Sequence, residues 1–108
     1  MTQIDTPSDT QTPVFSEFAN EPDFLEILVV FAKTMQEKRD ILQKLLDDRD
    51  FVQMKFQAHQ IKGAGGGYGF SGLSARAAEL EAACEAQQQG AVESALDGVL
   101  RYMARIRV

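Results

Sequence analysis

Apolar side chains recur along most of the chain at steps of three and four residues, the period of an amphipathic helix. The spacing predicts a first helix over about 22–48, with Asn20 as N-cap and continuous or broken near Lys38. A second begins after Asp50, which with Gln53 resembles a capping box, and ends among the glycines near residue 67. The third starts near Ser71 and ends before Gly90, which suits a helix terminus, and the fourth contains Val92, Leu96, Val99, Met103 and Ile106.

No segment alternates apolar and polar residues with period two, so the pattern gives no support for strands. Four amphipathic helices with short connections favour an all-α, antiparallel four-helix bundle, because each apolar stripe needs partners. Residues 1–19 are polar and contain Pro7 and Pro13, which prevent a continuous helix. We therefore expect a polar N-terminal tail or lead-in over 1–19 and one bundle domain over 20–108.

Composition excludes several classes of function. A net charge of −5 argues against nucleic-acid and anionic-membrane binding, which both depend on basic surface. The chain has one cysteine, Cys84, and one histidine, too few for a disulfide or a structural zinc site. Its longest apolar run, Ile27 to Ala32, is too short to span a bilayer, and no signal peptide is evident. We expect a cytoplasmic monomer that binds no metal or cofactor of its own.

The charged residues are unevenly distributed. No Asp or Glu occurs between residues 51 and 78, whereas Lys55, His59, Lys62 and Arg76 all lie in that window. An acidic protein thus has one segment without acids, and we expect this segment to form a basic surface.

His59 is expected to face solvent. The apolar stripe of the second helix points about 130° away from it on an ideal helix at about 100° per residue; its members are Phe51, Met54, Ala58, Ile61, Gly65 and Tyr68. Lys55 and Lys62, four before and three after His59, are its neighbours on the helix surface. One imidazole is therefore bracketed by two ammonium groups.

Glycines follow the histidine closely. Gly63 and Gly66 leave the helix surface beside His59 nearly bare, so that another protein's backbone can approach. A mid-helix glycine costs about 1 kcal/mol relative to alanine, which indicates a packing or access role. The run 67–72 formally matches the dinucleotide fingerprint GxGxxG, but it follows a helix and not a strand, so we predict a helix end and a tight turn there.

These residues carry a family resemblance. The segment Ala58-His59-Gln60-Ile61-Lys62-Gly63, followed by Gly69, Leu73 and Glu79-Leu80-Glu81, resembles the signature of histidine-containing phosphotransfer (HPt) domains. The resemblance implies a four-helix bundle with a phosphorylatable histidine exposed midway along the second helix. By position that residue is His59, with Lys62 and Gly63 as its typical neighbours.

The function implied is that of a phosphorelay intermediate in two-component signalling. His59 would accept a phosphoryl group from a receiver-domain aspartyl phosphate and pass it to another receiver, with a histidine kinase or hybrid kinase as a further partner. Such a carrier is no enzyme, and the Mg²⁺ and acidic residues would belong to the receiver. Lys62 and Lys55 would offset phosphoryl charge or assist docking. Gln60 and Phe56 are candidate receiver contacts, although burial of Phe56 under the first helix or the tail is an equal alternative.

Two other classes stay open. The phosphoacceptor domain of a sensor kinase is also helical, but an acidic residue typically follows its histidine, where this chain has Gln60. A helical interaction module that docks on or inhibits a sensor kinase without being phosphorylated would have a similar surface. The simplest interpretation of Glu79, Glu81 and Glu85 is a solvated face of the third helix, and that of Cys84 a buried structural thiol.

Overall fold

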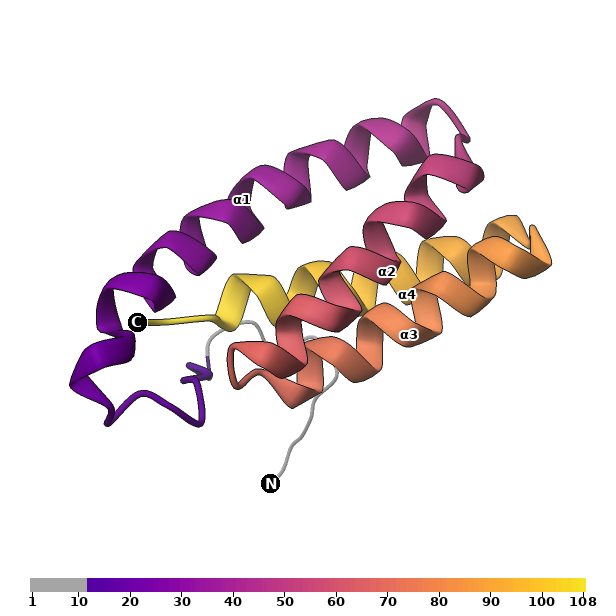
Figure 1. Cartoon of the computed structure of the whole chain (residues 1–108). Helices are drawn as coiled ribbons and strands as arrows, with labels where there is room; N and C mark the ends of the chain where they lie inside the picture. Colours follow the sequence, from indigo (N-terminus) through magenta and orange to yellow (C-terminus); the bar gives the residue numbers. More distant parts are fainter. Residues whose placement is uncertain (1–11) are drawn as a thin grey trace, which may run out of the picture.

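The structure, a computed structural model, describes residues 12–108, and residues 1–11 of the predicted tail lie outside the described residues. Its elements are the 3₁₀ turn η1 (Pro22–Phe24) and the helices α1 (Leu25–Asp47), α2 (Phe51–Gly67), α3 (Ser71–Ala86) and α4 (Gln89–Arg105). The helices run antiparallel along the chain (Figure 1), which confirms the predicted all-α bundle. None of the helices within residues 12–108 combines the length and hydrophobicity needed to cross a bilayer.

The helix ends differ in detail from those expected. α1 runs unbroken past Lys38, and the turn before it is preceded by Glu21, so Asn20 is not its cap. Asp50 does cap α2, since its Oδ1 accepts the backbone N–H of Gln53 at 3.1 Å. α3 ends at a left-handed Gln87, and Gly90 lies inside α4, so Gly90 terminates no helix.

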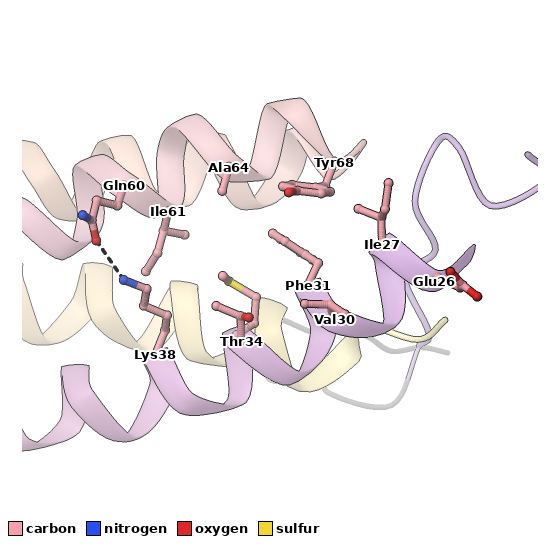
Figure 2. A pocket seen from close by; sticks show the side chains of 11 residues that line it. Glu26, Ile27, Val30, Phe31, Thr34, Lys38, Gln60, Ile61, Ala64 and Tyr68 are labelled. Atoms are coloured by element: carbon pink, nitrogen blue, oxygen red, sulfur yellow. Dashed lines mark hydrogen bonds between the residues drawn. The ribbon is translucent and has the colours of Figure 1, made fainter. Parts of the chain in front are cut away.

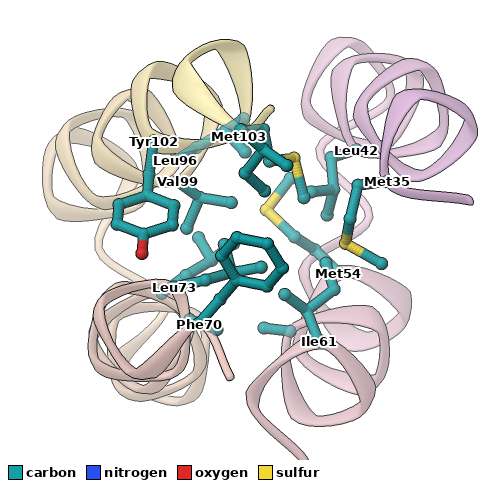
Figure 3. Packing of buried hydrophobic residues seen from close by; sticks show 14 of the residues in the cluster. Met35, Leu42, Met54, Ile61, Phe70, Leu73, Leu96, Val99, Tyr102 and Met103 are labelled. Carbon is teal, nitrogen blue, oxygen red and sulfur yellow. The ribbon is translucent and has the colours of Figure 1, made fainter. Parts of the chain in front are cut away.

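The core lies on the axis between the four helices, where their apolar stripes meet (Figure 3). The buried residues of the last three helices include Met54, Ala58, Ile61, Gly65, Leu73, Ala77, Leu80, Cys84, Val92, Leu96, Val99 and Met103, with Ile106 just beyond α4. Of the stripe predicted for α2, Phe51 and Tyr68 are only partly buried against this core. Cys84 is accordingly a buried thiol, and burial raises its pKa. The period of the sequence therefore decides which face of each helix is inside.

α2 and α3 form the most closely packed pair. A Cβ on Gly65 would lie only 3.1 Å from the backbone nitrogen of Ser74 and 3.2 Å from the carbonyl oxygen of Phe70. Only glycine allows the two backbones to approach this closely. The Ser74 hydroxyl also donates to the carbonyl oxygen of Lys62, so a hydrogen bond joins α3 to α2 two turns before Glu81. These contacts fix how the two helices are aligned.

The segment that precedes the bundle is bonded to it. Val14 pairs with Ile106 beyond the end of α4 in an isolated bridge. Ser16 is buried, and its hydroxyl donates to the carbonyl oxygen of Tyr68 at 2.6 Å. Part of the expected tail is thus held against the turn between α2 and α3. The predicted boundary between residues 19 and 20 stays a prediction.

We expect Gly69→Ala to lower the free energy of unfolding by at least about 2 kcal/mol. Gly69 has φ +85°, and an added Cβ would collide with the Ser16 hydroxyl and the Glu17 backbone nitrogen. The matched control is Gly67→Ala, since a Cβ there meets nothing within 4 Å. Urea unfolding followed by circular dichroism should leave the control unchanged or slightly more stable; equal effects of the two substitutions would contradict this account.

Candidate functional site

His59 lies midway along α2 with 65% of its side chain exposed. The buried residues of α2 face the core, and the imidazole projects away from it, as its phase predicts. The ring is therefore accessible to another macromolecule.

A carboxylate of α3 holds the ring. Glu81 Oε2 lies 3.0 Å from His59 Nδ1, and Glu81 Oε1 lies 2.8 Å from Lys62 Nζ. Only 20% of the Glu81 side chain is exposed, so the prediction of a solvated face is wrong for this residue, whereas Glu79 and Glu85 are exposed as expected. One glutamate thus joins the histidine and its lysine neighbour.

The charge of Glu81 determines which ring nitrogen carries the proton. The hydrogen bond from Lys62 is the largest cause that holds the pKa of the Glu81 carboxyl below its ordinary value, and the bond to His59 acts in the same direction. An ionised carboxylate only accepts hydrogen bonds. His59 Nδ1 must therefore carry a proton and donate it, which leaves Nε2 as the unprotonated nitrogen of a neutral ring. The nucleophilic nitrogen is thus the one remote from Glu81.

The second lysine is also paired. Lys55 Nζ lies 2.9 Å from Glu85 Oε2, and this bond raises the pKa of Lys55. Only α2 itself lacks acidic residues, because Glu81 and Glu85 of α3 lie against its surface. The fourth basic residue of the window, Arg76, lies over the ring of Tyr102 at 5.1 Å and is not brought to the histidine. The expected uniformly basic surface is thus wrong, and the site is a set of paired charges.

The role of Glu81 could have been found from the sequence with one additional argument. His59 and Glu81 are equally far along the chain from Phe70, which lies in the turn between α2 and α3, and so are Lys55 and Glu85. In an antiparallel helix pair, residues equidistant from the turn lie at the same height. The spacing across the turn was the signal, and periodicity within one helix cannot detect it.

The surface past the imidazole is bare. A Cβ on Gly63 would meet nothing within 4 Å, and one on Gly66 would meet only the Ser74 hydroxyl, at 3.4 Å. No contact inside the described chain requires Gly63 to be a glycine. Glycine lowers the stability of the helix, so its presence at position 63 indicates that another molecule has to approach the backbone there.

An apolar surface lies on the other side of the histidine. Phe56 is 57% exposed and Val52 is 74% exposed, so burial of Phe56 under the first helix or the tail is wrong. Together with Lys55, His59 and Glu81 they line a hollow of about 420 Å³. The sequence reasoning missed Val52, which precedes Phe56 by one helical turn.

A second groove, of about 590 Å³, separates α1 from α2 (Figure 2). Its apolar wall includes Ile27 and Val30, and Lys38 lies at the end nearer Gln60. Lys38 Nζ donates to Gln60 Oε1 at 2.8 Å and to Gln57 Oε1 at 2.6 Å. Gln60 is exposed, as a partner contact requires. The helical spacing marks Lys38 only as a place where the first helix could break, and it does not indicate that Lys38 lies beside the site.

We expect Lys62→Met to raise the pKa of Glu81 toward its ordinary value of 4.5, because Lys62 is the main cause of the lowered value. Lys55→Met is the control, since it removes an equal charge two turns from Lys62 and spares the bond between Lys62 and Glu81. Carboxyl-carbon NMR titration measures both. A Glu81 pKa that shifts as much in the control as in Lys62→Met would show that this hydrogen bond is not the cause.

The same pKa shift sets the sign of a pH dependence. A carboxyl with a lowered folded pKa contributes stability that is present above its unfolded pKa and lost as pH falls through the folded pKa. The difference in unfolding free energy between the wild type and Lys62→Met should therefore shrink as the solution is acidified below about pH 4.5.

The comparisons with known proteins agree with this geometry. A family model described as Hpt domain matches residues 26–108, which include α2, α3 and α4 and all of α1 except Leu25. No curated protein and no solved structure matches the chain. Hpt domains are phosphocarrier modules of phosphorelay signalling, where they interact with receiver domains and kinases. The match spans more than half of the chain, so the protein belongs to the Hpt domain family.

Proposed function

We propose that His59 is the phosphoacceptor, taking a phosphoryl group from the aspartyl phosphate of one receiver domain and passing it to another. The observation that carries this proposal is the contact of an exposed imidazole with a carboxylate through Nδ1, from which the tautomer follows. Nδ1 is bonded to an ionised carboxylate at 3.0 Å, so the free electron pair belongs to Nε2. Family membership alone supplies the reaction type, and the geometry supports this residue and this atom.

In the proposed step, the Nε2 electron pair of His59 attacks phosphorus in line with the aspartyl oxygen. The N–P bond forms, the P–O bond breaks, and the electron pair of that bond leaves with the receiver's carboxylate. No proton has to move, because Nε2 carries none. The ring gains positive charge as it bonds to phosphorus, and Glu81 offsets that charge across the Nδ1 hydrogen bond. The receiver supplies Mg²⁺ and its acidic ligands.

Lys62 is proposed to neutralise the phosphoryl oxygens. Its ammonium is placed beside the histidine by the bond to Glu81, and 40% of its side chain is exposed. The four-carbon stem lets the ammonium turn from Glu81 toward an incoming anion. Lys55 lies one turn before His59, on the opposite side of it from Lys62, and is bonded to Glu85, so its proposed role is in docking.

The receiver is proposed to dock over the bare and apolar parts of the surface around His59. Gly63 and Gly66 admit its backbone, and exposed Phe56 offers an apolar contact. The Gln60 oxygen is engaged by Lys38, so its amide N–H groups are the donors offered to the receiver.

We expect the wild type to acquire an acid-labile, alkali-stable label from a receiver domain phosphorylated with acetyl phosphate, and His59→Gln to acquire none. The substitution removes the only imidazole in the chain. Filter or gel assays after acid and alkali treatment measure the label, and its transfer to a second receiver measures the onward step. Binding without a label would instead support the non-phosphorylated interaction module. Labelling by ATP alone would support a kinase.

We expect Gly63→Ala to slow phosphoryl transfer from the receiver about tenfold while it raises the unfolding free energy by up to about 1 kcal/mol. An added methyl group would meet nothing in the free protein, yet it would occupy the surface proposed for the receiver. Gly98→Ala is the matched control, because Gly98 also lies within a helix, α4, with open space at its Cβ. The control should gain similar stability and transfer at the wild-type rate; equal transfer rates in both variants would refute close approach at Gly63.

A further inference from the structure

Lys38 differs from the other two lysines near the site in what it is bonded to. Lys55 and Lys62 are each paired with a glutamate of α3. The hydrogen bonds of Lys38 to α2 go to uncharged carboxamide oxygens, those of Gln57 and Gln60. Within residues 12–108, no carboxylate lies within ion-pair distance of its ammonium. Lys38 is therefore a cation beside the site whose charge is not neutralised.

The neighbours of Lys38 along α1 do not neutralise it either. The residues three and four positions away are Thr34, Met35, Ile41 and Leu42, none of which is charged. Glu26 shares the groove but lies three turns earlier in the helix. The positive charge is thus held at one end of the groove, with an apolar wall beyond it.

The position of Lys38 links the groove to the histidine. Gln57 and Gln60 lie on α2 two residues before and one residue after His59, and their oxygens accept hydrogen bonds from the ammonium of Lys38 on α1. Figure 2 shows the bond to Gln60. The groove beyond Lys38 is lined by Ile27 and Val30, which are 44% and 64% exposed. A protein docked over His59 and this groove therefore meets a cation next to the histidine and apolar side chains further away.

We propose that Lys38 is a specificity-determining contact, and that it binds an acidic side chain of the receiver that exchanges phosphoryl groups with His59. The same receiver places an apolar side chain in the groove against Ile27 and Val30. This inference rests on the proposed function. It adds a partner contact that lies outside residues 59–63 of α2. Charge complementarity supports the occupant, because a domain that holds an aspartyl phosphate and its Mg²⁺ ligands has an acidic rim around that site.

The competing interpretation is structural. Lys38 would then only hold α1 against α2, because its two hydrogen bonds join these helices. The two interpretations differ in their dependence on salt. Removal of a docking charge changes the association rate and its dependence on ionic strength. Removal of a contact that only joins α1 to α2 lowers the free energy of unfolding at all salt concentrations.

The test compares Lys38→Met with Lys33→Met, which removes the same charge from an exposed position of α1 outside the groove. The measured quantity is the second-order rate of phosphoryl transfer from an acetyl-phosphate-treated receiver. At about 50 mM salt we expect phosphoryl transfer to Lys38→Met to be roughly tenfold slower than transfer to the wild type. At about 500 mM salt we expect the two rates to differ by less than about twofold. Lys33→Met should match the wild type, and Lys38→Arg should retain most of the rate. An unchanged rate in Lys38→Met at low salt overturns the inference.

A small phosphodonor separates docking from chemistry. Phosphoramidate cannot occupy the groove and His59 together, so Lys38→Met should take its phosphoryl group at the wild-type rate. Equal slowing with phosphoramidate and with the receiver, at both salt concentrations, would assign Lys38 a structural role and overturn the inference.

Failure of the proposed function has a different signature. If neither donor labels the wild type, or if His59→Gln is labelled as well, the phosphoacceptor assignment fails whatever Lys38 does. Binding of a beryllofluoride-treated receiver then decides the inference by itself. A weaker affinity of Lys38→Met at low salt, absent in Lys33→Met, supports the contact, and equal affinities overturn it.

Discussion

The site depends on the close packing of α2 against α3. α2 contributes the imidazole and two lysines but no carboxylate, so the partner that orients the ring has to come from α3. The glycine at position 65 lets the two backbones approach, and the bond from the Ser74 hydroxyl to Lys62 fixes their alignment. Glu81, two turns beyond Ser74, is then placed against the histidine. A shift of α3 by one turn would separate Glu81 from both His59 and Lys62.

The ion pairs around the histidine contribute chemistry more than stability. Solvent-exposed pairs add little to the free energy of folding, because water screens them and long side chains lose freedom in forming them. The fold is stabilised by the apolar core between the four helices, on the other side of α2. The surface pairs are therefore free to exchange partners when an anion arrives, without loss of the bundle.

Periodicity within single helices predicted the fold, because the direction of each side chain relative to the core depends on residues three and four apart. It placed His59 outside and Met54, Ala58 and Ile61 inside, as the structure has them. It failed for Glu81 and Lys38, since both reach the site from other helices. Their contacts depend on the alignment of α3 and on the separation of α1 from α2, which no single-helix pattern contains.

The pairing of Lys62 with Glu81 suits a carrier that has to release what it accepts. An unpaired lysine would contribute its full attraction to a bound phosphoryl group and would hold that group against onward transfer. In the proposed transfer, Lys62 has to leave Glu81, 2.8 Å away, before it reaches the phosphoryl oxygens. Only the difference between the two attractions then stabilises the phosphorylated state. In this proposal Glu81 offsets the charge of the ring both in the transition state and in the phosphorylated state. The exchange of Lys62 between Glu81 and the phosphoryl group is therefore what limits how strongly the phosphorylated state is favoured.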